Sequence, residues 1–151
     1  MHKFLLIATG LISCTSLLCS CNSNENAIKE SEDEVIAIHD EVMHKTGSMV
    51  KLQKKIKQRI ASLDSLKSVG SASSSLRIDE EREQAVRLSR DLKAADSLMY
   101  YWMDHYKGDT LTKLSSDDAL KYLAAQKDFL TDVQAKYNAS LEQATQFLGK
   151  K

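Results

Sequence analysis

Hydrophobic residues recur at every seventh position along most of this chain, and that repeat predicts long helices packed side by side. In residues 31–68, one heptad position holds Val35, Val42, Met49, Ile56 and Leu63. The second seam position holds Ile38, Lys45, Leu52, Arg59 and Leu66, so Lys45 and Arg59 are its polar exceptions. We expect one continuous helix here, opened by a capping box of Ser31 and Glu34.

A second apolar row lies beside the first on this helix and consists of Ile36, Met43 and Val50. The row widens the hydrophobic stripe beyond that of a two-stranded coiled coil. It therefore predicts that the first helix packs against two partner helices.

The same repeat predicts two further helices, over residues 76–107 and 116–149. The first of these ends before Gly108, a residue favoured after a helix, and its seam contains Trp102 and one polar exception, Glu81. The second follows a capping signal at Ser115, and its polar exceptions are Gln126 and Ser140.

Valine and isoleucine never alternate with polar residues over the length of a strand, and the chain has no proline. We therefore expect an all-α fold: an elongated antiparallel up-down-up three-helix bundle or coiled coil over residues 31–151. A helical hairpin that oligomerises and a longer open coiled coil are the alternatives.

Residues 1–20 are predicted to be a cleaved signal peptide rather than part of the fold. Lys3 supplies the charged start, and the apolar run over residues 4–18 is too short to span a membrane comfortably. The end of this segment, Leu18-Cys19-Ser20-Cys21, resembles the lipobox of bacterial lipoproteins. That resemblance implies that a diacylglyceryl group is attached to Cys21, with palmitate-type chains holding the protein on a membrane.

Cys14 is the alternative lipidation site, because residues 11–14 also fit the lipobox pattern. Cleavage there would leave a signal shorter than the usual range of about 15 to 30 residues, so Cys21 is favoured. An ordinary cleaved signal without lipid is the remaining alternative. Residues 21–30 are polar and aperiodic, and we expect them to form a flexible tether of roughly 15 to 18 Å.

Composition narrows the possible functions. All three cysteines lie at or before position 21, so the exported body can form no disulfide. The 21 basic and 21 acidic residues balance, which gives no indication of nucleic-acid binding. No phosphate-binding loop, nucleophile elbow or paired acid–base carboxylates occur, so we expect a protein that is not an enzyme and has no cofactor.

The expected topology gathers histidine and aromatic residues at the membrane-proximal end of the bundle. The candidate interaction residues there are His39, His44, Tyr100, Tyr101 and His105. Trp102 either contributes to the same surface or is buried at the seam. Aromatic residues and methionine are favoured at protein interfaces, so a partner protein in the cell envelope is the first hypothesis.

A metal site is the alternative hypothesis for this end of the bundle, with His39, Met43, Met103 and His105 as ligands. Imidazole and thioether groups together suit copper, and imidazole also suits zinc. However, no established His or Cys metal-binding spacing is present. We therefore favour no metal.

A basic run on the first helix contains no acidic residue between Glu41 and Asp64, and comprises Lys51, Lys54, Lys55, Lys57 and Arg59. Its lysines fall at outer heptad positions, which is typical of a solvated helix face. A lipid phosphate surface or an acidic partner is the functional alternative.

Residues 37–56 (AIHDEVMHKTGSMVKLQKKI) and 98–106 (LMYYWMDHY) resemble small helical lipoproteins of Gram-negative bacteria described as viral A-type inclusion protein-like. His39-Asp40-Glu41-Val42-Met43 and Trp102-Met103 carry the resemblance. It implies an uncharacterised envelope lipoprotein and supplies no catalytic residues. Asn22 is not the aspartate associated with inner-membrane retention, which favours the outer membrane.

Overall fold

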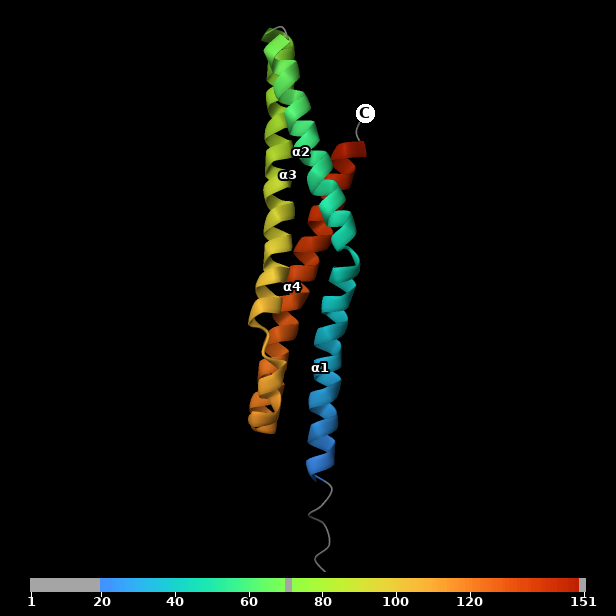
Figure 1. The fold of residues 1–151 in the computed structure, drawn as a ribbon, viewed down its shortest axis with the longest axis vertical. Helices are drawn as coiled ribbons and strands as arrows, with labels where there is room; N and C mark the ends of the chain where they lie inside the picture. Colours follow the sequence, from blue (N-terminus) through green and yellow to red (C-terminus); the bar gives the residue numbers. More distant parts are fainter. Residues whose placement is uncertain (1–19, 70–71, 150–151) are drawn as a thin grey trace, which may run out of the picture.

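The computed structural model describes residues 20–69 and 72–149, and this part of the chain is all-α. Its elements are α1 (Ser20–His44), α2 (Thr46–Val69), α3 (Ala72–His105), a short 3-10 helix η1 (Gly108–Lys113) and α4 (Ser116–Gly149). α1 and α2 follow one another as a single long rod, so three long helical units pack together (Figure 1).

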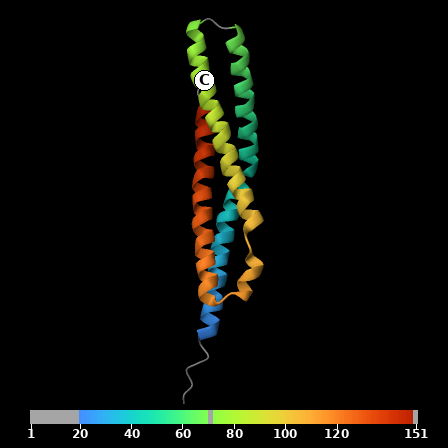
Figure 2. The same ribbon diagram turned by 90° about the vertical axis from the view of Figure 1, so that its left-hand side faces the viewer.

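The chain rises along α1 and α2, descends along α3 and rises again along α4 (Figures 1 and 2). α2 packs mainly on α3, whereas α1 packs mainly on α4, and α3 and α4 also pack together. The paired α2 and α3 extend beyond the end of α4. The first helical unit is therefore longer than the predicted 31–68 and much longer than α4.

α1 and α4 run parallel in a constant register. Lys127 Nζ donates to Glu34 Oε2 at 2.7 Å, and one heptad later Gln134 Nε2 donates to Glu41 Oε2 at 2.8 Å. Both pairs are 93 residues apart in sequence. The nearby carboxylate raises the pKa of Lys127. Such flanking polar pairs are typical of coiled coils, where they set the register.

The expected continuous helix over residues 31–68 is interrupted at Lys45. There the Lys45 N–H bonds the Val42 carbonyl at 2.9 Å and the Lys45 carbonyl accepts from Ser48 at 3.0 Å, both three residues apart. The side chain of Lys45 donates to Asn138 Oδ1 of α4 at 2.8 Å. The break separates the half of the rod that packs on α4 from the half that packs on α3.

The expected tether over residues 21–30 is also wrong, because α1 begins at Ser20. Ser31 therefore lies inside a helix and is not its N-cap. Ile28 packs against the hydrophobic core and lies one heptad before Val35. The heptad repeat thus continues into the segment that looked aperiodic, and burial of Ile28 favours the helix there.

The other helix limits are closer to expectation. α3 begins at Ala72 and ends at His105, against the predicted 76–107, and Gly108 opens η1 rather than following a helix directly. The bounds of α4 agree with the prediction. Its capping interaction is present too, since the Asp118 N–H donates to Ser115 Oγ at 3.2 Å and Ser115 Oγ donates to Asp118 Oδ2 at 2.7 Å.

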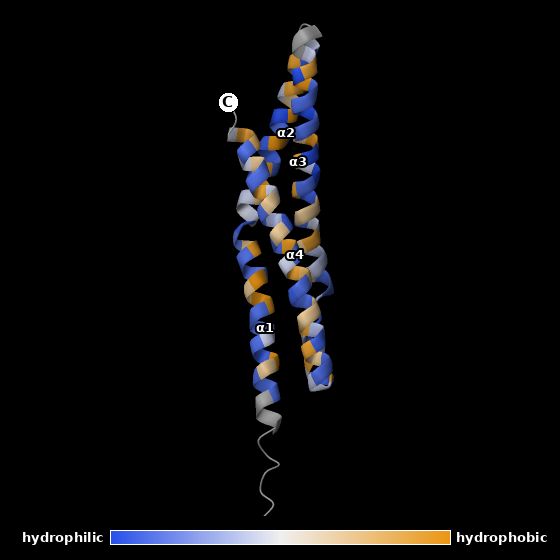
Figure 3. Ribbon diagram, turned by 180° about the vertical axis from the view of Figure 1, so that it is seen from behind, coloured by the Kyte–Doolittle hydropathy of each residue, from blue (hydrophilic) through white to orange (hydrophobic). Residues whose placement is uncertain are grey.

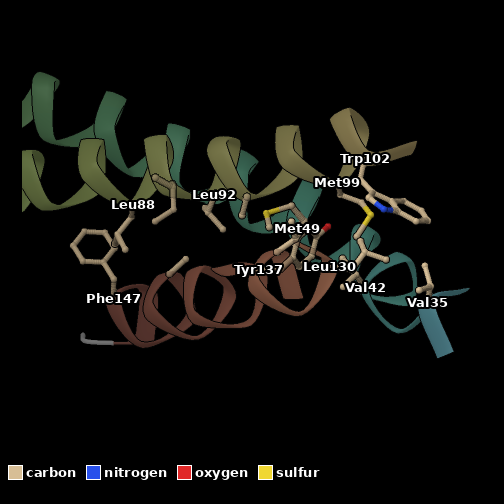
Figure 4. Close-up of a cluster of buried hydrophobic side chains, with 14 of the residues drawn as sticks. Val35, Val42, Met49, Leu88, Leu92, Met99, Trp102, Leu130, Tyr137 and Phe147 are labelled. Atoms are coloured by element: carbon tan, nitrogen blue, oxygen red, sulfur yellow. The ribbon is translucent and has the colours of Figure 1, made fainter. Parts of the chain in front are cut away.

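The heptad positions form one continuous core along the molecule. Phe147 and Leu88 lie at one end of the cluster in Figure 4, and Trp102 and Val35 lie at the other. The second apolar row packs only in part as expected, because Met43 packs against the core whereas Val50 is 57% exposed and Ile36 37% exposed. Figure 3 shows hydrophobic residues recurring among hydrophilic ones along the helices.

Polar exceptions in the heptads form hydrogen bonds to neighbouring helices. Arg59 Nε and Nη2 both donate to Glu81 Oε1, at 2.8 and 2.6 Å. Ser140 Oγ donates to the Asp91 carbonyl at 3.4 Å. A polar group at a seam position is less costly when it is hydrogen-bonded, so these contacts account for residues that broke the repeat.

The predicted signal peptide and Cys14 lie outside the described residues, apart from Ser20. Cys21 belongs to the first turn of α1. Among the helices that the structure describes, none is sufficiently long and apolar to cross a membrane.

Candidate functional site: the histidine and aromatic end

A row of ring contacts runs from α1 through the end of α3 to α4. The centroids of His39 and Trp102 are 5.3 Å apart, those of Trp102 and Tyr106 4.7 Å, and those of Tyr106 and Tyr122 6.1 Å. The expected meeting of the three helix ends is thereby confirmed. We call His39, Trp102, Tyr106 and Tyr122 the inner row.

Hydrogen bonds satisfy the polar atoms of the inner row. Trp102 is only 5% exposed, and its Nε1 donates to Gln126 Oε1 at 2.9 Å. The Tyr106 hydroxyl donates to Glu32 Oε1 at 3.1 Å, and the Tyr122 hydroxyl accepts from the Lys107 N–H at 2.8 Å. Burial is the main cause that raises the pKa of Tyr106, and the nearby charge of Glu32 raises it further. The alternative that buries Trp102 at the seam is confirmed.

A second aromatic group lies on the outer surface of α3 and α4. Tyr101 is 54% exposed, and its ring stacks on His105 with centroids 4.0 Å apart. Phe129 of α4 lies 6.1 Å from Tyr101 on the same surface. His105 Nδ1 lies 2.8 Å from the Tyr101 carbonyl, which holds the imidazole against the helix. We call Tyr101, His105 and Phe129 the outer cluster.

The structure does not gather the five candidate interaction residues into one surface. His39 belongs to the inner row, with its Nδ1 2.9 Å from Asp40 Oδ1. His44 is exposed and lies beside Asp40, whose carbonyl is 2.6 Å from His44 Nδ1. Tyr100 is 56% exposed and points about 100° around the helix from Tyr101. Tyr101 and His105 alone form a contiguous pair.

The alternative metal ligands lie in different surroundings. His39 contacts Trp102, His105 stacks on Tyr101, and Met43 Sδ is 3.9 Å from Thr46 Oγ1. Within the described ranges, no group of three or more His, Cys, Asp or Glu side chains is arranged to hold a metal ion. No observation in this part of the chain therefore favours the metal hypothesis.

The position of α1 changes the distance between this site and Cys21. Because the helix is continuous from Ser20 to His44, the rise from Cys21 to His39 is about 27 Å. Closer to Cys21 lies a hollow of about 420 Å³ between α1 and η1, lined by Ile28, Leu111 and Leu114 among others. The helix thus fixes the separation between Cys21 and the aromatic residues, which a flexible tether would leave variable.

Several residues of the site were not among its sequence candidates. Gln126 accepts from Trp102, Glu32 accepts from Tyr106, and Phe129 joins the outer cluster. Gln126 carried a usable signal, since a polar residue at a seam position requires a partner across the seam. Phe129 carried none, because its proximity to Tyr101 depends on the register of α4 against α3.

Comparisons of the chain with protein-family models, with curated proteins and with solved structures gave no match. The resemblance to small helical lipoproteins consequently stays a prediction from the sequence.

Proposed function

We propose that the protein is a non-catalytic lipoprotein of the bacterial cell envelope, in which a helical module attached through lipid at Cys21 binds another envelope protein. The outer membrane is the favoured location. The observation that carries the binding role is the outer cluster, where Tyr101 and His105 stack in the open rather than in the core. Stacked, half-exposed aromatic rings bury a large area when a partner covers them.

Lipidation is tested by metabolic labelling with an alkyne analogue of palmitate. The unsubstituted protein and Cys14→Ala should incorporate the label, whereas Cys21→Ala should not and should accumulate as a longer precursor. Labelling that survives Cys21→Ala and is lost in Cys14→Ala would assign the lipid to Cys14. If neither the unsubstituted protein nor the variants incorporate the label, the segment is an ordinary signal peptide without lipid.

Partner binding is tested by photo-crosslinking in cells with an aryl-azide amino acid at position 101. The matched control carries the same amino acid at Thr145, an exposed position of α4 whose hydroxyl bonds only its own helix. We expect a discrete protein adduct from position 101 and none from position 145. Adducts with bulk lipid alone, or identical products from both positions, would contradict the proposal.

A further inference from the structure

A groove between the α1–α2 rod and α3 has apolar walls that no described element covers. It contains a hollow of about 330 Å³ lined by Ile60 of α2 and by Val86, Ser89, Arg90 and Lys93 of α3. Gln53, one heptad before Ile60, contacts Asp96 of α3, while Glu41 contacts α4. Ile60 therefore lies on the flank of the rod that faces α3, away from the flank that faces α4.

Exposed apolar side chains continue along both walls of this groove. Val50 on the rod is 57% exposed, and on α3 Val86 is 42% and Tyr100 56% exposed. The contacts of Gln53 with Asp96, of Asp64 with Arg82 and of Lys67 with Asp79 set the antiparallel register, which places Val50 within about one helical turn of Tyr100. Val50, the last member of the second apolar row, thus faces an open groove instead of a partner helix within the chain.

The rim of the groove is cationic. By the same register Lys57 lies within about one turn of Lys93, and Lys54 and Arg90 flank them. Lys54, Lys57 and Lys93 form no ion pair with any residue that the structure describes, and Arg90 Nε lies 3.3 Å from Asp91. Near the far end of the same helices Lys67 pairs with Asp79 at 2.6 Å, and Arg82 pairs with Asp64.

We propose that this groove binds an amphipathic α-helix of another protein, whose apolar row is flanked by glutamate or aspartate. The proposal rests on the proposed protein-binding function and names the chemical class of the partner. A helix laid between two helices presents its apolar stripe to both, as in helix-in-groove recognition. The unpaired cations of the rim select a partner with acidic flanks, because like charges in that position repel.

The test uses the lipidated protein purified from membranes and placed in nanodiscs of zwitterionic lipid. The probe is a fluorescein-labelled helical peptide of about three heptads with leucine at the seam and glutamate beside it. The control peptide has lysine in place of every glutamate. We expect anisotropy to report saturable binding of the glutamate peptide only, weakened by salt.

Variants locate the binding to the groove. Lys57→Glu with Lys93→Glu should weaken the glutamate peptide about tenfold or more and allow the lysine peptide to bind. Val50→Asp should weaken binding of the glutamate peptide, with folding checked by circular dichroism. Lys121→Glu, on the outer face of α4 with a 79% exposed side chain, is the matched control and should change nothing.

Four results would overturn the proposal: no binding, equal binding of both peptides, self-association lost on Lys93→Glu, or binding of anionic vesicles without binding of peptide. The third would assign the groove to a second copy and the fourth to a membrane surface. If crosslinking from position 101 also yields a protein adduct, each of these four results removes only the inference about the groove, and the proposed function stands.

Discussion

Tyr137 is buried in the middle of the core, and its hydroxyl has no hydrogen-bond partner among the described residues. The residue is 1% exposed. Burial raises the pKa of its phenol, and the Thr46 side chain lowers that pKa to a smaller extent. A buried hydroxyl without a partner costs about 1 to 3 kcal/mol. Phenylalanine keeps the ring and leaves only a small void, which costs a few tenths of a kcal/mol at about 24 cal/mol per Å³. Tyr137→Phe should therefore stabilise the fold by roughly 1 kcal/mol.

The same substitution elsewhere in the chain supplies matched controls. Tyr106→Phe removes the hydrogen bond to Glu32, and Tyr122→Phe removes the acceptor of the Lys107 N–H. Each should destabilise the fold by about 0.5 to 1.5 kcal/mol. Tyr101→Phe alters an exposed ring and should stay within about 0.5 kcal/mol of the unsubstituted protein.

Urea unfolding followed by far-ultraviolet circular dichroism measures all four variants, with the m-value expected to be unchanged. A gain of 1 kcal/mol for Tyr137→Phe would raise Tm by about 3 to 5 °C in a domain of this size. If Tyr137→Phe instead destabilises as much as Tyr106→Phe, the reasoning is refuted and the hydroxyl is bonded in the native state. Thr46→Val would then test Thr46 as the partner.

The remaining predictions concern alkaline pH, the seam ion pair and the start of α1. The raised pKa values of Tyr106 and Tyr137 mean that the folded state keeps protons that the unfolded state loses above about pH 10, so stability should fall as pH rises from there; constant stability between about pH 9 and 11 would contradict this. Arg59→Leu and Glu81→Leu should each destabilise by about 1 kcal/mol, while the double variant should recover the loss because two leucines pack at the seam; additive losses in urea unfolding would refute the coupling. Amides of residues 24–30 should be protected in hydrogen exchange as helical amides are, and exchange at random-coil rates would restore the tether.

The heptad repeat was sufficient to predict the helical class and most helix limits. On the first helix it identified the buried positions Val35, Val42, Met49, Ile56 and Leu63, and the Ser115 signal located the start of α4 to the residue. It was not sufficient for the break at Lys45. The rod changes its main packing partner there from α4 to α3, and that change depends on where α4 ends in space. The repeat describes which face of a helix is apolar but not which helix will cover it.

The candidate site was predictable in composition but not in arrangement. Proximity of the three helix ends follows from the topology, and it correctly brought His39, Trp102 and Tyr106 together. Which rings face inward depends on the rotation of α3 about its own axis. A turn of about 100° separates Tyr101 from Trp102 and decides that the first is exposed and the second buried.

The helical start of α1 fixes the distance between Cys21, the proposed lipid attachment point, and the groove. With lipid on Cys21, the rise along the rod places Val50 about 44 Å and Ile60 about 58 Å from the attachment point. A rod standing upright would therefore present the cationic groove well away from lipid headgroups, beyond the Debye length of about 8 Å. A rod lying flat would bring the groove within reach of them. When the rod stands upright, its exposed lysines lie beyond the reach of lipid headgroups, which favours a protein helix as the ligand of the groove. Labelling of Lys57 and Lys93 by a reagent attached to lipid headgroups would show instead that the rod lies flat.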